Sequence, residues 1–229
     1  MPAQVHALRA LLDQRFPDTA PLVHATRPVL ATGVAALAGA LPGGGLPRGR
    51  LTAWVPGHGA TALLLAACRA ALSRGERAAW IDTAGTIANG WEQGPLLLRP
   101  ASGRLALECA EDLLRCGGFA LVVLTGAPAR DRQRIRLGRI AREGGSALVV
   151  SDDDGFGAAL RVSARTLPGD YRWTPGPCGE PAELESVTVR VTATALGWSR
   201  SAEIPIPILP YELRLSLEPC LVDRRGTAR

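Results

Sequence analysis

Short apolar runs separated by helical segments restrict the fold of this chain more than any other feature. Residues 119–124 and 147–150 are continuous apolar runs, and the segment 130–142 between them is predicted to be a helix. Strands that are apolar on both faces occur in parallel sheets covered by helices on either side. The same alternation is expected earlier in the chain, with strands at 51–55, 78–81 and 95–98 and helices at 60–73 and 104–115.

The last third of the chain has a different pattern, in which extended segments follow one another without helices. Residues 160–167, 187–195 and 202–208 alternate or run apolar, as antiparallel strands joined by loops do. Between the first two, residues 168–181 are rich in Pro and Gly and are expected to form an exposed loop. The predicted fold class is therefore α/β, with a central, mostly parallel sheet flanked by helices and antiparallel strands at its C-terminal edge.

The two ends of the chain differ from this core. Residues 4–16 carry apolar side chains at helical spacing, and three prolines punctuate the segment that follows. We therefore expect an N-terminal helix and linker arm at 1–27, a core domain at 28–210 and a C-terminal tail at 211–229. The N-terminal helix either packs on its own domain or docks on a neighbouring molecule, and it and the tail are the best candidates for docking on partner proteins.

Composition and charge argue against several kinds of site. The five cysteines have no CxxC spacing and the three histidines are not clustered near them, which argues against a metal site. An odd number of cysteines without a signal-peptide pattern indicates a reducing, cytoplasmic location. No apolar run approaches the roughly 18 residues of a membrane span. The net charge of +5 is compatible with an approach to DNA or to an acidic protein surface.

A glycine-rich loop lies between the first predicted core strand and the helix that follows it. Such a loop presents backbone N–H groups to phosphates, while a Lys supplies positive charge and a Ser or Thr hydroxyl holds Mg²⁺. All 26 basic residues of this chain are arginine, and Ala60 stands where the Lys is expected. The loop, which is also about two residues short compared with the eight-residue motif, consists of Pro56, Gly57, His58, Gly59, Ala60 and Thr61.

The order of these segments resembles the nucleotide-binding core of the RecA family. The resemblance begins with Ala31-Thr32-Gly33 and Gly43-Gly44-Gly45-Leu46-Pro47-Arg48-Gly49-Arg50, which lead into the loop. It continues through 78–82, 96–100, 106–108 and 113–123, and the late strands resemble the family's terminal antiparallel hairpin region. The similarity covers roughly residues 28–208, and it implies a RecA-like core domain.

The departures from the family pattern fall on the groups that hydrolyse ATP. The resemblance places Ala84 at the position of the catalytic Glu and Thr125 at that of the Asp that helps to hold Mg²⁺. With Ala60, three parts of the hydrolytic site are missing, so we expect a non-enzymatic protein with no cofactor. The resemblance also implies that both DNA-binding loops of the family are replaced, the first by the short segment 126–129 and the second by the acidic turn 151–155.

A RecA-like chain without these groups resembles the ImuA family, RecA-related accessory proteins of bacterial mutagenesis cassettes. That resemblance implies an adaptor in SOS-induced, error-prone translesion DNA synthesis that binds ImuB, an inactive Y-family polymerase relative. RecA and an error-prone replicative-type DNA polymerase are further candidate partners. Two alternatives stay open: a cell-division inhibitor similar to SulA, and a residual nucleotide-binding switch that uses Gly57, Gly59 and Thr61.

Several other residues have both a functional and a structural interpretation. The charged segment 130–142 offers a surface for DNA phosphates or an acidic partner, but its arginines spread around the helix and leave Ile135, Gly138 and Ile140 for the sheet. We favour a solvated helix face, with nonspecific nucleic-acid contact as the alternative. Ordinary structural roles are also expected for His58, Trp80, Trp91 and the Asp152–154 turn. The arginines concerned are Arg130, Arg132, Arg134, Arg136, Arg139 and Arg142.

Overall fold

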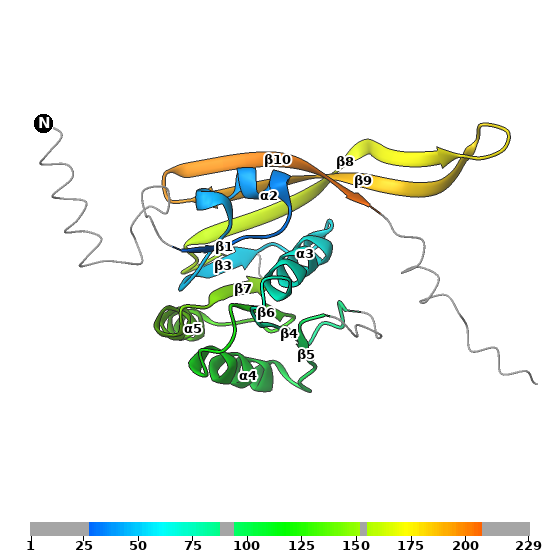
Figure 1. Cartoon of the computed structure of the whole chain (residues 1–229). Coiled ribbons are helices and arrows are strands. Elements are labelled where there is room, and N and C mark those ends of the chain that lie inside the picture. Colours follow the sequence, from blue (N-terminus) through cyan, green and yellow to red (C-terminus); the bar gives the residue numbers. More distant parts are fainter. Residues whose placement is uncertain (1–27, 88–93, 152–154, 208–229) are drawn as a thin grey trace, which may run out of the picture.

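The computed structural model describes residues 28–87, 94–151 and 155–207. Its centre is one mixed sheet with the strand order β10-β9-β8-β3-β7-β6-β4-β5 (Figure 1). Five strands form its parallel centre: β3 (Leu51–Trp54), β4 (Ala78–Asp82), β5 (Leu96–Leu98), β6 (Leu121–Thr125) and β7 (Ala147–Ser151). Each agrees with a predicted strand to within two residues at either end. The parallel centre of the sheet is therefore confirmed.

The antiparallel strands lie at the edge, as the sequence predicts. They are β8 (Leu160–Pro175), β9 (Pro181–Ala195) and β10 (Trp198–Pro207). The start of β8 pairs in parallel with β3, after which β8, β9 and β10 pair antiparallel with one another. The sheet changes from parallel to antiparallel within this one chain segment.

Helices cover the two faces of the parallel centre. The long ones are α3 (Ala60–Leu72), α4 (Gly103–Arg115) and α5 (Asp131–Gly144), and the shorter elements before them are β1 (Val29–Leu30), α2 (Ala35–Ala40), the 3-10 helix η2 (Pro42–Gly44) and β2 (Leu46–Pro47). Ser102 begins α4 by accepting a hydrogen bond from the Leu105 N–H at 3.3 Å. Gly145 follows α5 with φ +68°, a left-handed conformation that favours glycine.

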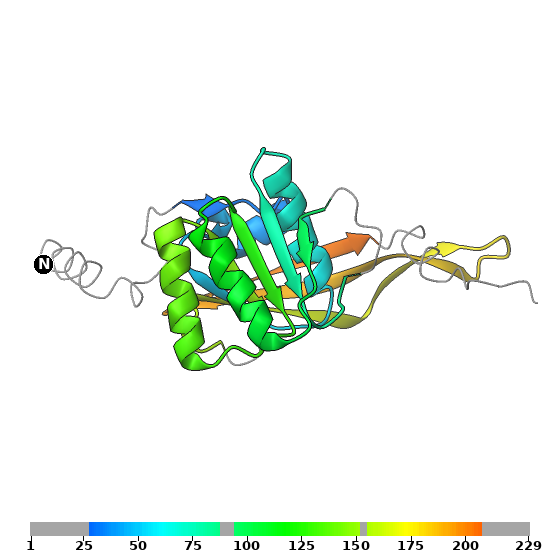
Figure 2. The same cartoon turned by 90° about the horizontal axis from the view of Figure 1, so that it is seen from below.

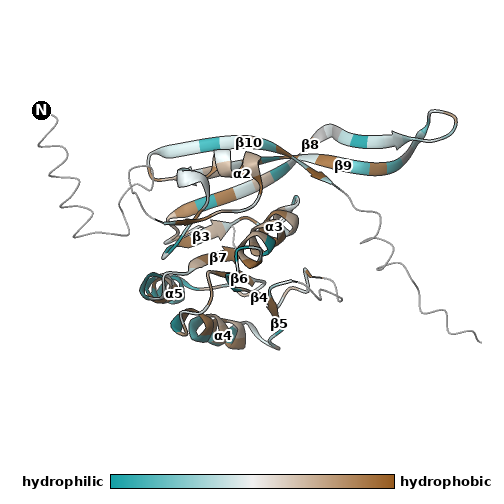
Figure 3. Ribbon diagram, in the orientation of Figure 1, coloured by the Kyte–Doolittle hydropathy of each residue, from teal (hydrophilic) through white to brown (hydrophobic). Residues whose placement is uncertain are grey.

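Alternating side chains of the central strands divide the core into two layers. The ribbon of β7, at the centre of the sheet, is apolar for most of its length (Figure 3). In β6, Leu121 and Val123 pack on the side of α2 and α3, whereas Val122 and Leu124 pack on the side of α4 and α5. All four are fully buried. A strand buried on both faces must be apolar throughout, which is why these runs were recognisable in the sequence.

The prediction of an exposed loop at 168–181 is wrong. β8 continues to Pro175 and β9 begins at Pro181, so only a short turn separates them. The two strands project beyond the rest of the described core as a two-stranded ribbon (Figures 1 and 2). We call residues 169–185 the arm. The Pro and Gly content of this segment had suggested a loop. Instead, the backbone N–H and C=O groups of the two strands are satisfied by pairing with each other.

Candidate functional site

The loop between β3 and α3 closes on itself. Gly57, His58 and Gly59 all have positive φ, at +102°, +46° and +79°. The Ala60 N–H donates a hydrogen bond to the Gly57 carbonyl at 2.9 Å, which forms a tight turn. In a functional loop, phosphates bind the N–H groups at the start of the helix. Here the Ala60 N–H at that place already has a partner within the protein.

Side chains of the antiparallel strands pack against this turn. A Cβ added to Gly59 would lie 2.5 Å from Ile206 Cδ1 and 3.4 Å from Val189 Cγ2. Ala60 is only 6% exposed, so the position expected for a Lys is in the core. His58 is exposed and Thr61 is half-buried. The apolar contact with β9 and β10 holds the turn in its closed conformation.

A polar network occupies the ends of β4 and β6, where the resemblance described above places Ala84 and Thr125. The Asp82 carboxylate accepts hydrogen bonds from the backbone N–H groups of Thr86 and Ile87, at 3.1 and 2.9 Å, and from the Thr86 hydroxyl at 3.1 Å. Burial by itself would raise the pKa of Asp82, but these bonds and one from Thr125 outweigh it and lower the pKa below its usual value.

Thr125 joins the two strand ends. Its hydroxyl accepts a hydrogen bond from Trp80 Nε1 at 3.1 Å and lies at donating distance from Asp82 Oδ1, 3.1 Å, and the Ile81 carbonyl, 3.2 Å. The Thr83 N–H and hydroxyl both donate to the Thr125 carbonyl. The Thr125 hydroxyl is thus hydrogen-bonded inside the fold. A metal ligand at this position would instead have to point outward.

The loops that follow β4 and β6 are also in close contact. A Cβ added to Gly126 would lie 2.5 Å from the Ala84 backbone nitrogen, so the chain can pass there only as glycine. Ala84 is exposed and its methyl group cannot act as a base. Among the described residues at these strand ends, the carboxylate of Asp82 is already hydrogen-bonded to Thr86, Ile87 and Thr125.

The arginines of α5 do not converge on one site. Arg134 is buried, and its side chain donates to the Ala129 carbonyl at 2.8 Å and the Phe156 carbonyl at 3.2 Å. Arg136 pairs with Glu111 of α4 at 2.8 Å, and Arg139 lies 3.8 Å from Glu143. The remaining three, Arg130, Arg132 and Arg142, are exposed.

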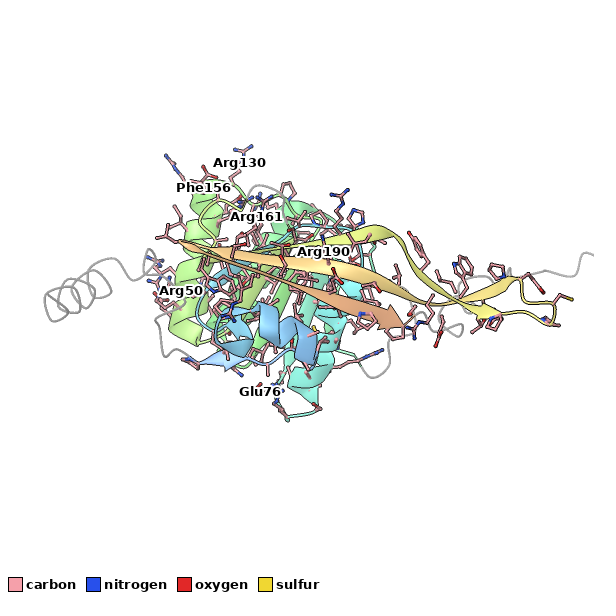
Figure 4. The ribbon with its side chains drawn as sticks, turned by 90° about the horizontal axis from the view of Figure 1, so that it is seen from above. Arg50, Glu76, Arg130, Phe156, Arg161 and Arg190 are labelled. Carbon is pink, nitrogen blue, oxygen red and sulfur yellow. The ribbon has the colours of Figure 1, made fainter. Side chains whose placement is uncertain are left out.

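The expectation that Ile135 faces the sheet is wrong. Ile135 is 62% exposed, and Leu137, Ile140 and Ala141 pack inward together with Arg134. Arg134 can take this place because its long apolar stem is buried while its guanidinium reaches two backbone carbonyls. Figure 4 shows Phe156 beside Arg130, near the first turn of the helix. Periodicity alone did not distinguish a buried Arg from an exposed Ile.

The other residues singled out in the sequence have structural roles or lie outside the described residues. Trp80 is fully buried in the core between the sheet and α3. Trp91 and the Asp152–154 turn lie outside the described residues, as do the N-terminal helix and the tail.

Burial raises the pKa of the Cys68 thiol to about 12, so it behaves as a small apolar side chain. Within the described ranges, no group of three or more His, Cys, Asp or Glu side chains could hold a metal ion.

A comparison with solved structures decides the fold. The chain is similar to the crystal structure of the RadB recombinase, with a TM-score of 0.52 and 19% sequence identity over 71% of this chain and 88% of that one. The chain has a RecA-like fold. No family model matches the sequence, and a search of curated proteins found no match. Of the described helices, none is long and apolar enough to cross a membrane.

Two features of this RecA-like fold were not anticipated. The Trp80–Thr125–Asp82 network joins residues more than 40 positions apart, so no local pattern indicates it. The arm did leave a signal, because Tyr171 and Trp173 are spaced two residues apart as on one face of a strand. Proline and glycine on either side concealed that signal.

Proposed function

We propose that this protein is a non-enzymatic adaptor with a RecA-like fold, which acts in error-prone translesion DNA synthesis by binding ImuB. The observation that carries the proposal is the closed turn before α3, in which the Ala60 N–H is bonded to the Gly57 carbonyl. A loop that satisfies its own backbone and packs against Ile206 offers little to a triphosphate.

The missing charges support the same conclusion. One Lys–phosphate contact at about 4 Å is worth on the order of 4 kcal/mol at an effective dielectric of about 20, before desolvation. Ala60 supplies none of this, and the N-terminus of α3 contributes only a partial charge. A RecA-like fold without these hydrolytic groups can still offer a surface for binding, but it is poorly equipped for catalysis. The resemblance to the ImuA family supports ImuB as the partner, and RecA as a second one.

Co-purification tests this proposal. Tagged full-length protein and ImuB, expressed together and separately, should form a stoichiometric complex at micromolar concentration, and magnesium ATP should leave its affinity unchanged. A complex that forms only with magnesium ATP would indicate a nucleotide switch and contradict the adaptor proposal. The absence of any complex with ImuB, with folded protein on both sides, would remove ImuB as the partner.

A further inference from the structure

The arm exposes an apolar face that nothing covers within the part of the chain that the structure describes. Tyr171 and Trp173 lie on one face of β8, and Leu184 of β9 pairs directly opposite Trp173 on that same face. Tyr171 is 46% exposed and Trp173 is 48% exposed. Two large aromatic side chains on a projecting ribbon are unusual for a surface without a partner, because Tyr and Trp dominate the energetics of interfaces.

The arm is acidic although the whole protein is basic. Its sequence contains four carboxylates and one guanidinium, while the chain carries a net charge of +5. Glu183 and Glu185 are exposed on β9, beyond the last residue that β10 pairs with. Glu180 is used in the turn, where it accepts a hydrogen bond from the Cys178 N–H at 3.0 Å. The surface that fits this arm is therefore apolar at its centre and positively charged around it.

A surface of that kind lies on α5. Arg132, Ile135 and Arg139 are spaced three and four residues apart, so they share one stripe of the helix. All three are exposed, and Ile135 is the most exposed large apolar side chain of the described helices. An exposed Ile between two guanidinium groups can receive a Trp or Tyr ring, with cation–π contact on either side and the carboxylates of the arm within reach.

The two surfaces lie at opposite ends of the molecule. Figure 2 shows α5 on the side of the core that is farthest from the arm. One copy cannot bring its own arm onto its own α5, but two copies can join in this way. We propose that the arm of one copy docks on the Arg132–Ile135–Arg139 stripe of a second copy, and that the chain self-associates head to tail through this contact. Such a contact is heterologous, so a pair of copies keeps one free stripe, on the copy whose arm is bound, and one free arm, on the other copy. The inference does not depend on ImuB binding.

Light scattering on the full-length protein tests the contact directly. The average mass should rise with protein concentration near 0.05 M salt. It should fall back toward that of one chain near about 0.5 M salt, where the Debye length is under about 5 Å. The arm variant Trp173→Ala/Glu183→Arg and the stripe variant Arg132→Glu/Arg139→Glu should each weaken self-association at least about tenfold, as expected for loss of an aromatic anchor or of paired charges. Leu196→Ser removes an equally exposed apolar side chain from the β9–β10 turn and should change nothing.

Mixing the two variants gives the sharpest result. The arm variant keeps an intact stripe and the stripe variant keeps an intact arm, so together they should form a heterodimer that grows no further. Wild-type protein that stays a monomer at low salt overturns the proposal. So does assembly that survives either variant, or a mixture that forms nothing. All altered side chains are on the surface, and the milder Ile135→Ser variant provides a second measurement if the stripe variant does not fold.

Discussion

At the scale of single residues, Thr125 links the ends of β4 and β6 through its side chain and its backbone. Its hydroxyl contacts Trp80, Ile81 and Asp82 at once, and its carbonyl accepts two bonds from Thr83. An Asp at this position would place a second carboxylate beside Asp82, and the two like charges would repel each other. Thr at this position avoids that repulsion and links the ends of β4 and β6.

Removal of the Thr125 hydroxyl should destabilise the protein. Thr125→Val keeps the shape of the side chain but loses its hydrogen bonds to Trp80 and Asp82, and we expect a loss of about 1–3 kcal/mol in the free energy of unfolding. Thr192→Val, which loses only an exposed hydroxyl–hydroxyl bond to Ser201, is the matched control and should cost less than about 0.5 kcal/mol. Urea unfolding measures both, and equal effects would mean that the network contributes nothing.

Asp82 should make stability depend on pH in acid. Because its pKa in the folded state is lowered from 3.8, the carboxylate stabilises the fold above that value, and this contribution is lost as pH falls through the folded-state pKa. Asp82→Asn should therefore be less stable than wild type from pH 7 to about 5, and the difference should shrink below about pH 4. The exposed Asp112→Asn variant is the control. A difference that is constant across this range would refute the assignment.

At the scale of elements, the strands and helices that are determined by local side-chain patterns could be predicted from the sequence. Strands such as β6 and β7 are apolar on both faces, and helices such as α3 have apolar side chains at a spacing that only a helix places together. The arm could not be predicted in this way, because two strands that project from a core are held by each other and by little else. The exposure of Ile135 was missed for a related reason, since helical periodicity does not reveal the bonds to the Ala129 and Phe156 carbonyls that let Arg134 face inward.

Restoring the missing Lys should not restore the phosphate site. Ala60→Lys places a charge at a buried position whose N–H is already bonded to Gly57, so we expect no saturable binding of a fluorescent ATP analogue at millimolar concentration. Arg69→Lys, on the exposed side of the same helix, controls for the added residue type. Saturable binding by Ala60→Lys alone would show that the turn opens easily and that only the charge was missing.

Excision of the outer part of the arm should leave the core folded. If Asn-Gly, which forms a two-residue hairpin turn, replaces residues 173–185, the Arg172–Ser186 pair closes the shortened ribbon, and Val187, which packs against the core, is kept. We expect the free energy of unfolding to change by no more than about 1 kcal/mol, because the arm adds no buried side chain to the two core layers. Urea unfolding measures this change, and a loss of several kcal/mol would mean that the arm belongs to the folding unit.

At the scale of the whole molecule, internal contacts close the carboxyl ends of β3, β4 and β6 in the RecA-like sheet. The turn before α3 is bonded to itself, and the ends of β4 and β6 are bonded to each other. The exposed aromatic side chains of the arm and the exposed arginines of α5 lie elsewhere, on opposite sides of the described core (Figure 2). This distribution favours a molecule that works through its surfaces.

Nucleotide binding and turnover by the wild-type protein test this account most directly. Equilibrium titration with a fluorescent ATP analogue in the presence of Mg²⁺, followed by an assay of phosphate release, should show no saturable binding at millimolar nucleotide and no turnover above that of buffer. Saturable, magnesium-dependent binding with phosphate release that disappears in Thr61→Ala protein would contradict the account, because it would show that the closed turn opens to form a working site.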